Sequence, residues 1–133
     1  MTAKSRLLTA LRRELARAGA PGRAAGARAY MKSAMPFHGV DTETLRAICR
    51  TAFASHPVPD AARWRRDVLA IWRGARFREE RYAAIGLTGD RRARPFQTME
   101  SLPMYEEMIV TGAWWDYVDV LASHRARNDK QPP

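Results

Sequence analysis

The sequence predicts an all-α fold in which antiparallel helix pairs stack into an α-solenoid. Strong helix formers dominate its 133 residues, and no stretch shows the sustained alternation of β-branched residues that a strand requires. Short turns join the predicted helices, so the helices form either a closed bundle or a stack of pairs. The last predicted helix is apolar on several faces, which favours the stack because a middle helix of a solenoid touches neighbours on two sides.

The N-terminal helices have clear start and stop signals. Pro21 suits a first helical turn, and Pro36 cannot continue a helix. Gly39 breaks the chain again, and either Asp41 or Thr42 is the N-cap of the next helix. The expected helices of this part are residues 3–18, 21–34 and 42–54.

The C-terminal helices follow the connector "HPVPD" and are separated by the basic turn "GDRRARP". Ser101 suits a cap, Pro103 a first turn and Gly112 a helix end. The tail 125–133 has no apolar anchor, so we expect it to be disordered and residues 1–124 to form one domain. The expected helices are residues 60–73, 77–88 and 101–112, and a seventh in "TGAWWDYVDVLASH", residues 111–124.

Apolar side chains at helical spacing predict the core, and they leave two residues of the seventh helix unexplained. Trp114 belongs to a core stripe, whereas Trp115 and Asp119, four residues apart, share a different face. Packing of Trp115 against a neighbouring helix, with Asp119 as a solvated acid, is the simplest explanation from spacing alone. The predicted core residues are Leu7, Leu8, Leu11, Leu15, Trp64, Val68, Ile71, Trp72, Tyr82, Ile85, Leu87, Tyr105, Met108, Ile109, Trp114, Val118 and Leu121.

Charge is distributed unevenly along this basic chain, which has a net charge of +9. Residues 1–94 carry 20 basic and 8 acidic side chains, whereas residues 95–124 carry 5 acidic and no basic ones. A basic surface of this kind favours a polyanionic partner, nucleic acid first and an anionic membrane second. The preference for arginine over lysine fits phosphate recognition and equally fits a genome rich in G and C.

Other residue patterns exclude several classes of function. No apolar run is long enough for a membrane span and no signal peptide is evident, so we expect a cytoplasmic protein. A single cysteine, Cys49, excludes an internal disulfide, and we expect it to be buried and inert. The three histidines lack a zinc-ligand spacing, so no metal is expected. The acidic pairs Glu79–Glu80 and Glu106–Glu107 are predicted to be solvated helix faces.

Three segments resemble the DNA alkylation repair family, the helical-repeat alkylpurine DNA glycosylases of the AlkD type. They are "RAYMKSAMPFHGV" (28–40), "REERYAAIGL" (78–87) and, most specifically, "YEEMIVTGAWWDYVD" (105–119). The resemblance implies HEAT-like helix pairs that cradle duplex DNA in a concave, positively charged face. It also implies hydrolysis of the N-glycosidic bond of cationic purines such as 3-methyladenine and 7-methylguanine, without a cofactor.

The resemblance assigns site residues. It makes Trp115 and Asp119 the catalytic pair, the same two residues that helical geometry sets apart from the core. It places Tyr30, Lys32 and Arg46 near the DNA-facing surface. From the residues alone, a core position for Tyr30 and solvated charges for Lys32 and Arg46 stay open.

The resemblance covers only the N-terminal portion of a typical family member, up to about His124. Family members carry a further catalytic-site arginine on a later helix, so we expect these residues alone to excise weakly or not at all. The implied partner is double-stranded DNA with alkylated bases, bound by a monomer or together with a partner that supplies further repeats. A non-catalytic DNA-binding protein and an α-helical protein-interaction scaffold are the alternatives.

Overall fold

The regular structure of the chain is helical throughout the part that is described, residues 6–31 and 35–112 of a computed structural model. The all-α class is confirmed for these residues, and α3, α4 and α5 begin or end within one residue of the expected positions. The "GDRRARP" turn contains a short 3₁₀ helix. The helices are α1 (Arg6–Ala18), α2 (Pro21–Met31), α3 (Thr42–Ser55), α4 (Ala61–Gly74), α5 (Arg78–Thr88), η1 (Arg91–Phe96), η2 (Met99–Ser101) and α6 (Leu102–Gly112).

Two aspartates cap the helices that follow the connectors. The Asp41 carboxylate accepts from the Thr44 backbone N–H at 2.8 Å, which decides between the two predicted caps of α3. Asp60 accepts in the same way from the Arg63 N–H at 2.7 Å at the start of α4. Each contact satisfies a backbone donor that has no partner within the helix, so the chain begins a helix at these points.

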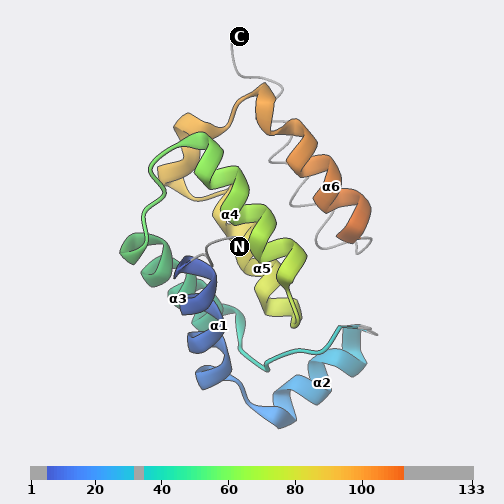
Figure 1. Ribbon diagram of the computed structural model, residues 1–133. Coiled ribbons are helices and arrows are strands. Elements are labelled where there is room, and N and C mark those ends of the chain that lie inside the picture. Colours follow the sequence, from blue (N-terminus) through green and yellow to red (C-terminus); the bar gives the residue numbers. More distant parts are fainter. Residues whose placement is uncertain (1–5, 32–34, 113–133) are drawn as a thin grey trace.

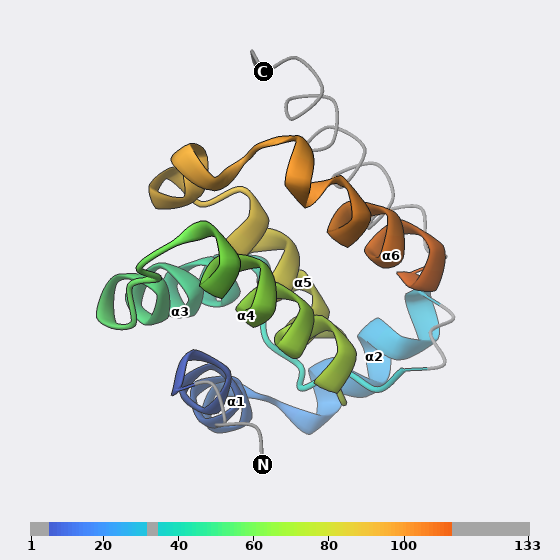
Figure 2. The same ribbon diagram turned by 45° about the horizontal axis from the view of Figure 1, so that its top comes forward.

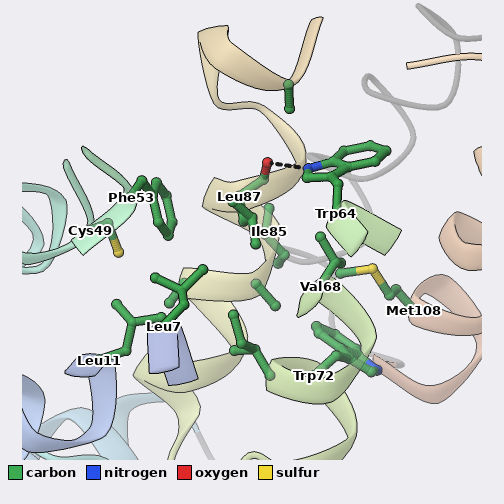
Figure 3. Packing of buried hydrophobic residues seen from close by; sticks show 14 of the residues in the cluster. Leu7, Leu11, Cys49, Phe53, Trp64, Val68, Trp72, Ile85, Leu87 and Met108 are labelled. Carbon is green, nitrogen blue, oxygen red and sulfur yellow. Dashed lines mark hydrogen bonds between the residues drawn. The ribbon is translucent and has the colours of Figure 1, made fainter. Parts of the chain in front are cut away.

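The core forms where α5 packs against α1, α3 and α4, and α6 extends it along α4 (Figures 1 and 2). Trp64 is fully buried and donates from its indole nitrogen to the Leu87 carbonyl at 3.0 Å, which ties α4 to α5 (Figure 3). Leu8, Tyr82 and Ile109 are only partly buried at its edge. The predicted core residues that the structure confirms as buried are Leu7, Leu11, Leu15, Trp64, Val68, Ile71, Trp72, Ile85, Leu87, Tyr105 and Met108.

Helix α2 lies at the edge of the molecule, where Figure 1 shows it apart from the α4 and α5 pair. None of its side chains from Pro21 to Ala29 is fully buried. Its start is fixed by a hydrogen bond from the Ala20 N–H to the Gly39 carbonyl at 3.1 Å. Gly39 has a φ of +87°, and a Cβ there would lie 2.1 Å from the Ala20 carbonyl oxygen, so only glycine allows this close approach.

The seventh predicted helix, including Trp114, Val118 and Leu121, lies outside the described residues, as does the tail 125–133. In the described ranges, no helix combines the length and apolar character needed to cross a membrane.

Candidate nucleic-acid interface

An open hollow of about 890 Å³ lies between α2, α3 and α5. Three arginines contribute to its lining, Arg23 from α2 and Arg46 and Arg50 from α3. Apolar and aromatic side chains form much of the remaining wall. The hollow therefore combines cationic groups with flat apolar surfaces.

The two arginines of α3 are the available cations of this hollow. Arg46 and Arg50 are four residues apart, so they share one helix face, and both are exposed. Neither side chain makes an ion pair or hydrogen bond with another residue of the described part. Arg23 is partly engaged, because its Nη1 donates to the Gly39 carbonyl at 3.1 Å and lies 4.0 Å from an Asp41 oxygen.

The carboxylates that line the hollow are already engaged by other donors. Asp41 caps α3, and the hydrogen bond from the Thr44 backbone N–H lowers the pKa of its carboxyl. Asp90 lies 3.3 Å from the Nη1 of Arg92. Neither acid forms an ion pair with Arg46 or Arg50 in the described part of the chain, so these two guanidinium groups have no partner at salt-bridge distance.

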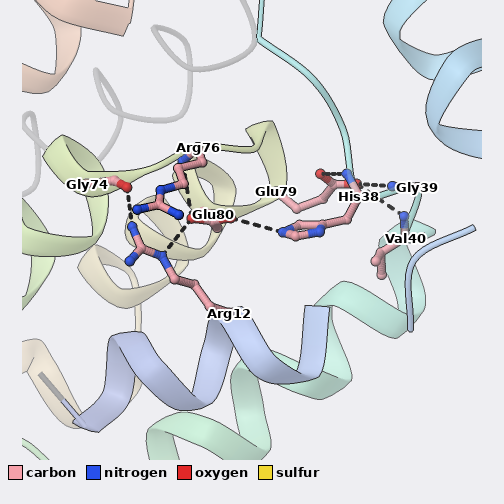
Figure 4. A network of polar contacts seen from close by, with 8 residues as sticks. All are labelled: Arg12, His38, Gly39, Val40, Gly74, Arg76, Glu79 and Glu80. Carbon is pink, nitrogen blue, oxygen red and sulfur yellow. Dashed lines mark hydrogen bonds and ion pairs between the residues drawn. The ribbon is translucent and has the colours of Figure 1, made fainter. Parts of the chain in front are cut away.

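Glu79 is the third carboxylate of the hollow, and it is buried rather than solvated. Its side chain accepts hydrogen bonds from three successive backbone N–H groups, those of His38 at 2.8 Å, Gly39 at 2.9 Å and Val40 at 3.1 Å (Figure 4). The residue is 2% exposed. The positive φ of Gly39 turns these N–H groups toward one point, which is the geometry of a backbone anion-binding concavity. The prediction of a solvated face was wrong because it considered only the helix and not the linker.

The neighbouring Glu80 is equally buried and joins three other elements. One carboxylate oxygen accepts from Arg12 Nε of α1 at 3.1 Å and from the Arg76 N–H at 3.3 Å, and the other lies 2.9 Å from His38 Nε2 (Figure 4). The His38 ring stacks on Phe77 with centroids 3.8 Å apart. Glu80 therefore ties α1 and the linker before α3 to the start of α5.

Arg78 completes the attachment of this linker, residues 36–40. Its backbone N–H donates to the Pro36 carbonyl at 2.9 Å, and its guanidinium lies 5.7 Å from the Phe37 ring centroid and 5.6 Å from that of Tyr82. The first turn of α5 therefore holds the linker through both backbone and side chains. Because the linker leads from α2 into α3, this attachment sets where the arginines of the hollow stand.

The structure describes only one of the predicted site residues in full. Arg46 lines the hollow, and its predicted place near a DNA-facing surface stays a prediction. Tyr30 belongs to α2, but its side chain is outside the described part, and so are Lys32, Trp115 and Asp119. The arrangement of the predicted catalytic pair therefore stays a prediction.

Two further groups of arginines, one in α4 and one in η1, lie at the surface. Arg65 lies 3.9 Å from Glu100 and Arg63 lies 3.8 Å from Asp67, whereas Arg66 is exposed. The η1 cluster Arg91, Arg92 and Arg94 is exposed as well.

Sequence reasoning missed Arg23, Arg50 and Glu79 as parts of the hollow. Arg50 had a usable signal, because it follows Arg46 by four residues on the same predicted helix. The signal for Glu79 was weaker: a glycine that breaks the chain, Gly39, and an acidic residue in the first turn of a helix forty positions later.

Cys49 also lines the hollow without offering chemistry. Burial raises the pKa of its thiol to about 12, which keeps it protonated and poorly nucleophilic, as its predicted inertness requires. Among the residues that the structure describes, no group of three His, Cys, Asp or Glu side chains is arranged to hold a metal ion.

The described part of the chain is therefore a small helical fold with an arginine-lined, partly apolar hollow at its surface. The chain belongs to the family described as DNA alkylation repair enzyme, whose family model matches residues 11–129. The match includes the hollow and the segment that carries Trp115 and Asp119. A comparison with curated proteins gave no match.

Proposed function

We propose that this protein acts in DNA repair by hydrolysing the N-glycosidic bond of cationic alkylated purines in duplex DNA. The observation that carries the proposal is the family match over residues 11–129, which includes the motif "WWDYVD". The arginine-lined hollow supports it, because a surface of uncompensated guanidinium groups suits phosphates. In this proposal the chain forms HEAT-like repeats, binds alkylated double-stranded DNA as a monomer or with further repeats, and works in the cytoplasm at the nucleoid.

The chemistry assigned to Trp115 and Asp119 follows from the charge of the substrate. A purine alkylated at N3 or N7 is a good leaving group because it carries a positive charge while joined to the sugar. Bond cleavage then develops positive charge on the sugar, which the Asp119 carboxylate stabilises while it orients the attacking water. The Trp115 ring contributes cation–π attraction, worth about 0.5 to 2 kcal/mol depending on desolvation.

The absence of basic residues between 95 and 124 suits this assignment. Asp119 therefore has no basic neighbour in this part of the sequence that would weaken its attraction for a cationic base. The basic remainder of the chain, with Arg46 and Arg50 in the hollow, takes the role of binding phosphates. Substrate binding and catalysis are thereby given to regions of opposite charge.

The substitution Asp119→Asn tests the catalytic assignment. It keeps the shape and removes the charge, so excision of 7-methylguanine should fall by roughly 10² to 10³. Affinity for the same duplex should stay level or rise, because one repulsion with phosphate disappears. Free base is measured by chromatography, for the 133-residue chain and for a version extended by the C-terminal repeats of the family. Equal excision with and without the substitution in the extended protein would exclude this role for Asp119.

A non-catalytic DNA-binding protein is the second candidate, and the exposed Arg46 and Arg50 favour it independently of Asp119. Replacing both by alanine should weaken duplex binding and reduce the slope of log affinity against log salt by roughly 2. Arg13 and Arg17 on α1 are exposed too, and their replacement is the matched control. Salt-dependent binding without base release in the extended protein would favour this candidate, and affinity that does not change with salt would exclude both functions.

A further inference from the structure

We propose that Trp72, Arg81 and Thr111 form an anchor that positions the segment carrying Trp115 and Asp119. The inference rests on the proposed function, since it assigns positioning residues for the same site. Thr111 lies four residues before Trp115 and eight before Asp119 in the chain. It is the last residue before Gly112, where the described part of the chain ends.

The hydroxyl of Thr111 is fixed by two hydrogen bonds. It accepts from the indole Nε1 of Trp72 at 2.8 Å and donates to the Glu107 carbonyl at 2.7 Å. Trp72 of α4 is 1% exposed and lies on the side facing α6 (Figure 3). A buried core side chain, rather than solvent, therefore fixes the orientation of the Thr111 hydroxyl.

The backbone of Thr111 is held from a different helix. Arg81 of α5 lies with its guanidinium carbon 4.3 Å from the Trp72 ring centroid, and its Nη1 is 3.3 Å from the Thr111 carbonyl oxygen. Its position over the indole restricts the orientation of the Arg81 guanidinium, which in this orientation donates to the Thr111 carbonyl.

A third contact holds α6 one turn earlier. Glu107, whose carbonyl accepts from Thr111, forms a bidentate pair with Arg73 of α4 at 2.6 and 2.5 Å. The last turn of α6 is thus attached to α4 by two neighbouring residues, Trp72 and Arg73, and to α5 by Arg81. Three independent contacts at one helix end restrict both its direction and its rotation.

This restriction matters for the proposed chemistry. Catalytic groups must be held close to their productive geometry, and displacement by about 1 Å can cost roughly 10² in rate. Thr111 precedes Trp115 by four residues in the sequence, so the place and direction of α6 at Thr111 set where the following segment begins. The alternative is that the Thr111 hydroxyl only satisfies the buried indole donor of Trp72, in which case its loss would lower stability and change nothing else.

The test compares Thr111→Val, which keeps the shape and removes the hydroxyl, with the matched control Thr111→Ser, which keeps it. Amide hydrogen exchange is measured on peptides covering residues 112–119 and on peptides from α4 and α5, at a temperature where each variant is folded. We expect Thr111→Val to speed exchange in 112–119 by about 10-fold, with α4 and α5 unchanged and the serine variant like the wild type. Unchanged exchange in 112–119, or equal acceleration in all three regions, would overturn the anchor.

Activity gives the second readout. Single-turnover excision of 7-methylguanine by the extended protein should slow by about 10-fold for Thr111→Val, with duplex affinity unchanged and the serine variant within about twofold. A loss of affinity in place of the rate would contradict a positioning role. If the wild type itself releases no base, the proposed glycosylase function fails, and the exchange measurement still decides the anchor separately.

Discussion

Two pairs of adjacent glutamates, Glu79–Glu80 in α5 and Glu106–Glu107 in α6, occur in helices of 11 residues each. Both pairs suggest a solvated helix face, because adjacent helical positions diverge by about 100° and at least one should reach water. Only the second pair behaves that way. Glu79 and Glu80 are each 2% exposed, whereas Glu106 is exposed and Glu107 is half-buried at the surface.

Hydrogen-bond donors from other parts of the chain decide whether a glutamate of these helices is buried. Glu79 meets three backbone N–H groups of the linker, which compensate its charge without any basic side chain. Glu107 meets one cationic side chain, that of Arg73, which is 61% exposed. The first arrangement is fixed by the fold and removed from solvent, and the second is screened by water and salt.

The largest effect should come from Glu79→Gln. An amide has one acceptor oxygen and one donor group, so it cannot serve all three linker N–H groups, and at least one buried donor is left facing another donor. We expect the free energy of unfolding, measured by urea denaturation, to fall by about 3 kcal/mol.

The matched control for this variant is Glu106→Gln, the same substitution at an exposed position, which should change stability by less than about 0.5 kcal/mol. Binding to duplex DNA should weaken for Glu79→Gln even where the protein is folded, because the linker sets the places of Arg23 and Arg46. Equal stabilities of the two glutamine variants would show that the linker N–H groups do not depend on Glu79.

A smaller effect is expected for Glu80→Gln. The amide oxygen can still accept from Arg12 and the Arg76 N–H, and the amide group can donate to His38 when its Nε2 is unprotonated. Arg12 is one-third exposed, so water solvates its unpaired charge. We expect a loss of about 1 to 2 kcal/mol in the same urea titration. A cost as large as that of Glu79→Gln would mean that the charge of Glu80, rather than its hydrogen bonds, holds α1 in place.

Local sequence signals predicted the helices and much of the core. Trp64, Val68 and Trp72 recur at helical spacing, and burial of such a stripe is a local property of one helix that needs no knowledge of its neighbours. Asp41 caps α3 and was one of its two predicted caps, whereas Asp60, the first residue of the predicted helix 60–73, is the cap of α4. These features depend on residues within one or two turns of each other.

The hydrogen bonds between Glu79 and the linker, residues 36–40, and the complete lining of the hollow could not be predicted in this way. Glu79 meets residues some forty positions earlier in the chain, and Arg23 joins Arg46 in the hollow only through the turn at Gly39. Such contacts depend on tertiary packing, which spacing along one helix does not contain. Arg46 lines the hollow, and its assignment to a DNA-facing surface stays a prediction, as do the assignments of Trp115 and Asp119.

The smallest effect should come from Glu107→Gln, and it should depend on pH and salt. The hydrogen bonds from Arg73 lower the pKa of the Glu107 carboxyl below its ordinary value of 4.5, so the ion pair stabilises the folded state above that pH. This contribution disappears as the pH falls through the lower folded pKa, where the carboxyl is protonated in both states.

Because both side chains are partly solvated, we expect Glu107→Gln to cost about 0.5 kcal/mol at pH 7 and low salt. Urea titrations should show the difference from wild type shrinking toward zero in about 1 M salt, where the screening length is about 3 Å, and again at low pH. The defect of Glu79→Gln should survive the same salt, because its donors are buried backbone groups. If salt removed both defects equally, the two glutamate pairs would not differ in the way their surroundings indicate.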